Sequence, residues 1–385
     1  MNRAVVVCLP AIVAAAASCR DVPQAPNPPI AEPLHYSTVR VDRLLYGTDV
    51  APGWGTLTIM LAADQSTHIV SMDYEDGRLR YAGCAGYCEE SQYWLTSTAD
   101  SGEFFEDVGA VLGADGIHVV YMRAGPVIRY AHCPGACYYR RNWVTSDLFS
   151  GSIGGNGPQT IPLAMDSSGR LHLAFLTPAG LWYATCSSAC GTPGAWQTGL
   201  VDSLPTFAYA IAATPAGRVD LLYPRDGLRF ASCASACTNA AAWQVALVDT
   251  ALGTSSPALA LGPGGVVHAA YASGGAYGIP PEIHYAVCAG GCTTPGAWQA
   301  SGLGTRSFYV STTVDATTGR AFVATSYGTT EVASCAGGCL VPAAWERVSV
   351  DTASSHRYLS VAVDSAGRAR LASTWFGVEY TQLKE

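Results

Sequence analysis

Short apolar stretches, separated by polar turn residues, recur along the chain from about residue 36 to its end. The clearest set is "TIPLAMDSSG", "RLHLAFLT", "GLWYATC" and "AWQTGLVDS", between residues 160 and 203. These segments are rich in β-branched and aromatic residues, and Gly, Asp and Ser lie between them, which is typical of short strands joined by tight turns. Outside the N-terminal segment, no stretch has the 3.6-residue periodicity of a helix. The pattern predicts an all-β protein built from a four-stranded unit.

The third strand of this unit ends in a cysteine phrase, in which a second cysteine follows four residues later and a tryptophan six residues after that. The first cysteines of six copies are separated by 49, 53, 47, 55 and 47 residues, within the range of propeller blades. In an oxidising compartment such a turn can bring two Cα atoms within disulfide distance. A tetrahedral metal site needs four ligands, whereas each copy offers two. We also expect each tryptophan to pack between blades. The six disulfides that we expect are Cys84–Cys88, Cys133–Cys137, Cys186–Cys190, Cys233–Cys237, Cys288–Cys292 and Cys335–Cys339.

A seventh copy is split between the two ends of the chain. After Trp345 three more strands follow, and the chain stops before any further cysteine. In four copies the tryptophan is followed six positions later by aspartate, as from Trp94 to Asp100, and "YSTVRVD" from Tyr36 to Asp42 is the fifth instance of this spacing. We predict a seven-bladed β-propeller over residues 36–385, in which residues 36–43 form the outer strand of the C-terminal blade. Such pairing closes the ring and removes exposed sheet edges.

This repeat pattern resembles the sialidase-like and BNR class of bacterial propellers. "TADSGEFF" at 98–105 loosely matches the Asp-box of that class. The resemblance implies a propeller fold and, as an alternative to simple binding, a glycan-active hydrolase or lyase. No catalytic residue of the family carries over to a numbered position of this chain.

The first residues have the features of an export signal. Arg3 precedes the apolar run "AVVVCLPAIVAAAA", and "AASC" ends at Cys19 in a sequence that resembles the lipobox of bacterial lipoproteins. Twelve of fourteen cysteines form the six pairs and Cys8 lies inside the signal, so Cys19 is left for lipidation. Cleavage by ordinary signal peptidase is the alternative. We expect a signal at 1–18, a Pro-rich tether at 19–35, and a lipid-anchored or secreted protein of the cell envelope.

Charge and histidine placement limit the partners. The net charge of −8 argues against nucleic acid, which is bound through clustered Lys and Arg. Four second strands begin at His68, His118, His172 and His268, which raises a metal hypothesis. Because these histidines occupy one repeated position per blade, they are better explained by a structural hydrogen bond from the imidazole to neighbouring backbone or hydroxyl groups. We expect no cofactor, no metal, and a monomer whose only membrane contact is the N-terminal lipid.

Ligand-binding residues are expected where the repeat is broken. The D-x-x-G and cysteine turns share one face of the disc, and the variable loops, which include Phe308, share the other. We predict a non-catalytic binding module for a glycan or an envelope protein, because aromatic, acidic and guanidinium groups suit a polar ligand. A hydrolase would need two carboxylates about 5 to 10 Å apart. The candidate binding residues on the variable loops are Tyr74, Asp76, Glu106, Arg225, Asp226, Glu282, Arg306 and Arg357.

Overall fold

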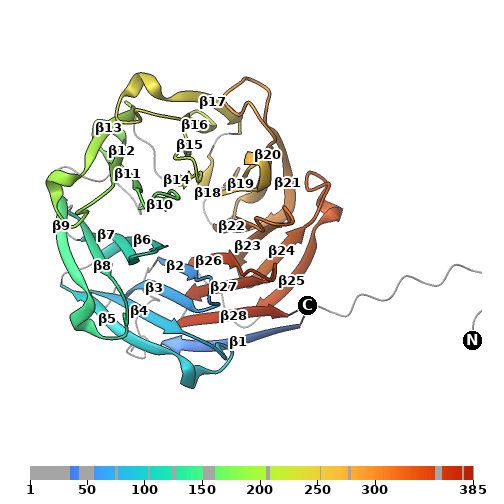
Figure 1. Cartoon of the computed structure of the whole chain (residues 1–385). Helices are drawn as coiled ribbons and strands as arrows, with labels where there is room; N and C mark the ends of the chain where they lie inside the picture. Colours follow the sequence, from blue (N-terminus) through green and yellow to red (C-terminus); the bar gives the residue numbers. More distant parts are fainter. Residues whose placement is uncertain are drawn as a thin grey trace, which may run out of the picture.

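The computed structural model arranges seven four-stranded antiparallel sheets around a central axis, as the blades of a propeller (Figure 1). It describes residues 35–42, 56–73, 77–102, 105–123, 127–150, 161–204, 209–251, 253–275, 279–351, 358–374 and 377–384. The expected signal, at 1–18, lies outside these ranges, as does the expected tether, at 19–35, except for its last residue, His35, which begins the first strand. Within the ranges, no helix is both long enough and apolar enough to cross a membrane.

Each blade runs from an innermost strand at the axis to an outermost strand at the rim. Blade 1 holds β2 (Leu57–Leu61), β3 (Thr67–Asp73), β4 (Arg78–Cys84) and β5 (Leu95–Ser101). Blade 2 holds β6 (Phe105–Gly113), β7 (Gly116–Arg123), β8 (Val127–Cys133) and β9 (Val144–Ser150). Blade 3 holds β10 (Leu163–Met165), β11 (Leu171–Thr177), β12 (Gly180–Cys186) and β13 (Gln197–Asp202).

The remaining blades follow the same order. Blade 4 holds β14 (Ala210–Ala213), β15 (Val219–Pro224), β16 (Leu228–Cys233) and β17 (Gln244–Asp249). Blade 5 holds β18 (Ser255–Leu261), β19 (Val267–Ser273), β20 (Glu282–Cys288) and β21 (Gln299–Arg306). Blade 6 holds β22 (Tyr309–Val314), β23 (Ala321–Tyr327), β24 (Thr329–Cys335) and β25 (Glu346–Asp351). Blade 7 holds β26 (Tyr358–Val363), β27 (Ala369–Thr374) and β28 (Val378–Lys384).

The N-terminal strand completes blade 7, which confirms the predicted closure of the ring. β1 (His35–Asp42) pairs antiparallel with β28, so the order of this sheet is β1-β28-β27-β26. Val39 lies directly opposite Tyr380, and the side-chain oxygens of Thr38 and Thr381 are 2.8 Å apart. The backbone groups on the edge of β28 are thereby paired instead of exposed.

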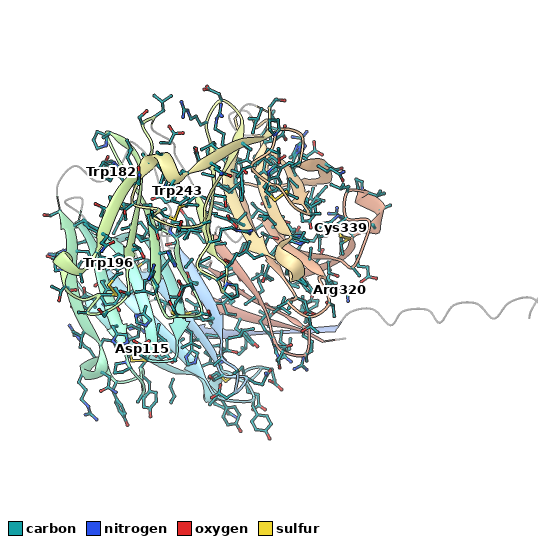
Figure 2. All side chains as sticks on the ribbon, turned by 45° about the horizontal axis from the view of Figure 1, so that its top comes forward. Asp115, Trp182, Trp196, Trp243, Arg320 and Cys339 are labelled. Atoms are coloured by element: carbon teal, nitrogen blue, oxygen red, sulfur yellow. A yellow bond between two sulfur atoms is a disulfide. The ribbon has the colours of Figure 1, made fainter. Side chains whose placement is uncertain are left out.

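All six predicted disulfides are formed, and each lies in the turn between the third and outermost strand of its blade. The tryptophan that follows donates its Nε1–H to the carbonyl of the second cysteine, as from Trp94 to Cys88 at 2.9 Å. The same indole packs on an aromatic ring of the preceding blade, as Trp243 does on Tyr183 at 5.5 Å between ring centres (Figure 2 labels Trp243). Each phrase therefore fixes a turn and an inter-blade contact together.

Most of these tryptophans directly follow a short 3-10 helix, which the pattern of strands and turns in the sequence did not predict. In blades 1, 2, 3, 4 and 6 it spans Ser91–Tyr93, Arg140–Asn142, Pro193–Ala195, Ala240–Ala242 and Pro342–Ala344. The residue before each second cysteine has a positive φ, which is 53° at Ala189 and 61° at Gly291. Two backbone reversals, together with the disulfide, thus fit into a connection of about ten residues.

Candidate functional site: the axial cavity

A cavity of about 440 Å³ lies on the propeller axis, and all seven blades contribute to its wall. The lining residues lie at the beginning of each innermost strand or directly before it, where the chain arrives from the preceding blade. This is the end of the strand nearest the variable loops, opposite the cysteine turns. The cavity therefore lies toward the face where the sequence predicted binding.

Small hydroxyl side chains on this wall connect the innermost strands of neighbouring blades. Thr56 Oγ1 accepts the backbone N–H of Val108 at 2.8 Å, and Ser311 Oγ accepts that of Val361 at 3.2 Å. Ser360 Oγ accepts the N–H of Ile59 at 3.3 Å, across the boundary between blade 7 and blade 1. Each hydroxyl that accepts such a bond still carries a proton that it can donate. The wall is thus held in place by the same groups that could contact a polar ligand.

Two tyrosines from adjacent blades form an aromatic surface on one side of the cavity. The rings of Tyr309, in blade 6, and Tyr358, in blade 7, are 4.8 Å apart with an angle of 51° between their planes. Phe308 and Tyr327 form an exposed pair next to them, with ring centres 5.6 Å apart. Aromatic rings at a partly open position offer a large apolar contact area together with a polar edge.

The opposite side of the cavity holds a carboxylate and a phenol. Asp107 at the start of blade 2 is 2% exposed, and Tyr209 at the start of blade 4 is 1% exposed. Burial raises the pKa of Tyr209 well above its usual value, and the negative charge of Asp107 raises it further. Tyr209 therefore stays a neutral phenol beside Asp107. The cavity is aromatic on one side and polar on the other, as small-molecule sites commonly are.

The predicted binding residues that the structure describes lie on the same face, but outside this cavity. Arg225 pairs through Nη1 with Asp202 of the preceding blade, and Asp226 next to it is exposed, with a φ of 48°. Glu282 lies directly opposite Arg306 across β20 and β21, and Arg306 Nη1 donates to the Pro280 carbonyl at 3.0 Å. Among the candidates that the structure describes, Glu282 and Arg306 are the one pair that the fold brings together from different strands. Tyr74, Asp76, Arg357 and the side chain of Glu106 lie outside the described residues.

The repeated histidines have the structural role that the sequence favoured. His68, His118, His172 and His268 each place Nδ1 within hydrogen-bond distance of the hydroxyl of a tyrosine on the neighbouring strand. Blade 4 has Phe230 in place of this tyrosine, and there the histidine position holds Asp220, which accepts from Ser232 Oγ at 2.6 Å. In blade 6 the two positions hold Phe322 and Val332. Each of the four histidines thus has a tyrosine hydroxyl as its partner, and in blade 7 Arg370 takes the same position and donates to the hydroxyl of Tyr380 at 2.9 Å.

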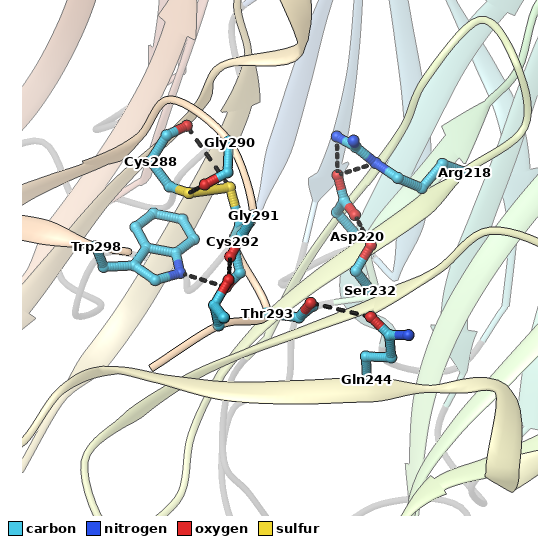
Figure 3. Close-up of a disulfide and its surroundings, with 11 residues drawn as sticks. Arg218, Asp220, Ser232, Gln244, Cys288, Gly290, Gly291, Cys292, Thr293 and Trp298 are labelled. Carbon is cyan, nitrogen blue, oxygen red and sulfur yellow. Dashed lines mark hydrogen bonds and ion pairs between the residues drawn. A yellow bond between two sulfur atoms is a disulfide. The ribbon is translucent and has the colours of Figure 1, made fainter. Parts of the chain in front are cut away.

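Further hollows lie on the other face, between neighbouring blades at the cysteine turns, and the one between blades 4 and 5 has a volume of about 520 Å³. Figure 3 shows the one between blades 4 and 5, where Arg218 pairs with Asp220 at 2.8 Å beside the Cys288–Cys292 disulfide. Thr293 Oγ1 donates to Gln244 Oε1 at 3.0 Å across the blade boundary. Comparable hollows follow blades 2 and 3. They repeat with the blades, whereas the axial cavity is formed once.

The cavity residues were missed because none of them belongs to a recognisable motif. One signal could have found them. Six positions before the residue that opens the turn after the innermost strand, six blades carry a polar or aromatic residue instead of an aliphatic one in the sequence. These residues are Thr56, Asp107, Thr160, Ser256, Tyr309 and Tyr358.

Comparison with known proteins gives structural similarity only. No protein-family model matches the chain, and no curated protein matches it in sequence. A mutant of the Aleuria aurantia lectin in complex with Fucα1-6GlcNAc aligns with a TM-score of 0.53 at 14% identity, over 78% of this chain and 97% of the lectin. The polysaccharide lyase Uly1 aligns with a TM-score of 0.57 at 12% identity, over 91% of this chain and 98% of the lyase.

A third similar structure is the α-L-arabinofuranosidase Arb93A of Fusarium graminearum, in complex with an iminosugar inhibitor. It aligns with a TM-score of 0.54 at 10% identity, over 91% of this chain and 97% of the enzyme. At such identities the similarity establishes the fold, and this chain is a seven-bladed propeller of four-stranded blades.

Proposed function

We propose that this protein is a glycan-binding propeller that acts outside the cytoplasm, with the axial cavity as its binding site. The observation that supports this most directly is the lining of the cavity, which combines the Tyr309–Tyr358 pair with serine and threonine side chains and with Asp107. Sugars have apolar C–H faces and polar edges, so they fit a site that combines aromatic surface with hydrogen-bonding groups. A volume of about 440 Å³ is within the usual range for small-ligand sites.

Binding is favoured over hydrolysis by the carboxylates of the cavity. Among its described lining residues, Asp107 is the one acid, whereas most glycosidases use two carboxylates about 5 to 10 Å apart. A glycan-active hydrolase or lyase of the sialidase-like class remains the second candidate, because the polysaccharide lyase and the arabinofuranosidase cover more of this chain than the lectin does. Turnover of a polysaccharide that is lost in both Asp107→Asn and Glu106→Gln would favour the enzyme.

A glycan array followed by calorimetry with the best ligand tests the proposal. We expect Tyr309→Ala and Tyr358→Ala each to weaken binding by tenfold or more, because each removes half of the aromatic surface. Tyr93→Ala is the matched control, since Tyr93 is an exposed tyrosine in the 3-10 turn of blade 1, on the opposite face. Unchanged affinity in both cavity variants, or an equal loss in Tyr93→Ala, would move the site elsewhere.

Export is part of this proposal. Six disulfides are typical of proteins that fold in an oxidising compartment. Cys19 takes no part in them, and lipidation at this residue would anchor the propeller at the cell envelope through the segment 19–35. Mass spectrometry of the exported protein would detect a lipid on Cys19, and Cys19→Ser would convert an anchored protein into a released or retained one.

A further inference from the structure

We propose that Asp115, His118 and His132 of blade 2 form a binding site for a divalent transition-metal ion. His118 on β7 and His132 on β8 lie directly opposite each other, with ring centres 4.6 Å apart and an angle of 22° between the planes. Asp115 belongs to the turn that enters β7, on the cysteine-turn face (Figure 2). One ligand atom from each residue lies within 4.8 Å of those of the other two.

The cluster exists because blade 2 departs from the repeat at one position. His118 has the repeated role described above, with Nδ1 at 2.6 Å from the hydroxyl of Tyr130. His132 has no counterpart among the other blades with a histidine on the second strand, where Gly83, Thr185 and Val287 occupy the opposing position. The packing of the repeat therefore explains His118 but not His132, whose Nε2 also lies 3.1 Å from the backbone carbonyl oxygen of Asp115. The expectation of no metal rested on the four repeated histidines, and His132 is not one of them.

The ligand set matches the chemistry of borderline divalent ions. Two imidazole nitrogens and one carboxylate suit Zn²⁺, Ni²⁺ or Cu²⁺, whereas Mg²⁺ and Ca²⁺ prefer oxygen ligands alone. His118 Nε2 is 2.8 Å from Asp115 Oδ1, and His132 Nε2 is 3.7 Å from Asp115 Oδ2. Bonds of about 2.0–2.1 Å in a tetrahedral site place ligand atoms about 3.4 Å apart. These two separations bracket this value, and the ligand atoms of all three residues lie within 4.8 Å of one another, so rotation of the side chains would bring them to metal-binding distances.

The surroundings provide a partner that orients His118 and an open position for a further ligand. In the empty site, His118 Nε2 donates to Asp115 and its Nδ1 accepts from Tyr130. Once Nε2 binds the metal, the ring proton moves to Nδ1 and is donated to the same hydroxyl, which can act either way. The Asp115 side chain is 69% exposed. The hollow in front of the cluster, about 340 Å³, is bounded by the cysteine turn of blade 3. Solvent or a ligand donor group can reach the ion from this hollow.

Calorimetric titration of the full chain, without an affinity tag and after chelator treatment, tests this site with ZnCl₂, NiCl₂ and CuCl₂. We expect saturable binding of one ion and no such heat with MgCl₂. His132→Thr copies the threonine of blade 3 and leaves the His118–Tyr130 bond intact, so it should fold normally and bind at least tenfold more weakly. Asp115→Asn should show a similar loss. His284→Thr, which removes a part-exposed imidazole in blade 5, is the matched control and should bind as the wild type does.

Two results would overturn the proposal. One is the absence of saturable binding for all three transition metals up to 1 mM. The other is an affinity that His132→Thr and Asp115→Asn leave unchanged, because the bound ion would then lie at another site. The Cu²⁺ complex provides an independent readout, since its visible absorption should shift when His132 is replaced, whereas replacement of His284 should leave the absorption unchanged.

Discussion

Thr38 and Thr381 lie opposite each other across the seam of the ring, with their hydroxyl oxygens 2.8 Å apart. The two residues are 343 positions apart in the sequence, because their strands β1 and β28 come from the two ends of the propeller. Near this seam Trp94 of blade 1 packs on Tyr380 of blade 7, with ring centres 5.1 Å apart. The tryptophans of the other five cysteine phrases each make the same contact with an aromatic ring of the preceding blade. The closing boundary is thus packed like the internal ones.

The first prediction concerns this seam. Thr38→Cys combined with Thr381→Cys should form a disulfide on oxidation, because side chains this close are compatible with disulfide geometry. The bond would close a very long loop, so we expect unfolding to require about 2 to 5 kcal/mol more free energy. Urea unfolding of the oxidised double variant measures this, with the same variant blocked by N-ethylmaleimide as control. Equal midpoints for the two forms would mean that strand β1 does not limit unfolding.

The second prediction concerns Phe149 and Phe175, which stand where three other blade boundaries have an aspartate and a tyrosine. At three blade boundaries a tyrosine hydroxyl donates to an aspartate of the preceding outermost strand, as Tyr121 does to Asp100 at 2.6 Å. Between blades 2 and 3 both positions are phenylalanine, and Phe149 stacks on Phe175 at 5.1 Å with an angle of 14°. At these four boundaries either a charged hydrogen bond or an apolar stack thus joins the two blades, and a mixture of the two would leave a polar group without its partner.

Phe149→Asp should therefore destabilise the protein by about 2 to 4 kcal/mol, since it replaces the stack with a carboxylate against an aromatic ring. Adding Phe175→Tyr supplies the missing donor and should recover about 1 to 2 kcal/mol of that loss. A double-mutant cycle by urea unfolding measures the coupling, with Phe175→Tyr alone as the fourth corner. Strict additivity of the two single changes would contradict the interpretation of the pair as alternative solutions of one contact.

The same residues explain how far the sequence could predict the fold and the site. Periodicity and the Tyr36-to-Asp42 spacing predicted the pairing of Val39 with Tyr380, because these features repeat locally and need no knowledge of tertiary contacts. Tyr309 and Tyr358 meet only because two blades are placed side by side, so no local pattern marks them as a pair. Arg225 was predicted to bind a ligand, yet its guanidinium pairs with Asp202 of another blade. Contacts between blades decide which polar side chains remain available, and such contacts are not written in any single repeat.

The third prediction concerns stability in mild acid. Burial lowers the pKa of His268 to about 4, and it also lowers the pKa values of His68, His118 and His172. For His118 and His172 the aspartate of the adjoining turn opposes the shift, whereas the turn near His268 begins with Gly262. His268 therefore has the hydroxyl of Tyr285 as its partner and no carboxylate in that turn. Its protonation in the folded state is correspondingly costly.

Because the pKa of His268 is lower in the folded than in the unfolded chain, the unfolded chain binds more protons between about pH 6.5 and pH 4. The stability associated with this residue is thus complete above pH 6.5 and is lost as the pH falls toward 4, by about 3 kcal/mol at most. His268→Gln keeps a hydrogen-bonding group near Tyr285 but does not titrate, so its free energy of unfolding should fall less steeply over this range. Urea unfolding at pH 4.5, 5.5, 6.5 and 7.5 gives both slopes. Parallel curves for the variant and the wild type would show that His268 is protonated equally easily in both states, and the burial argument for this residue would then be wrong.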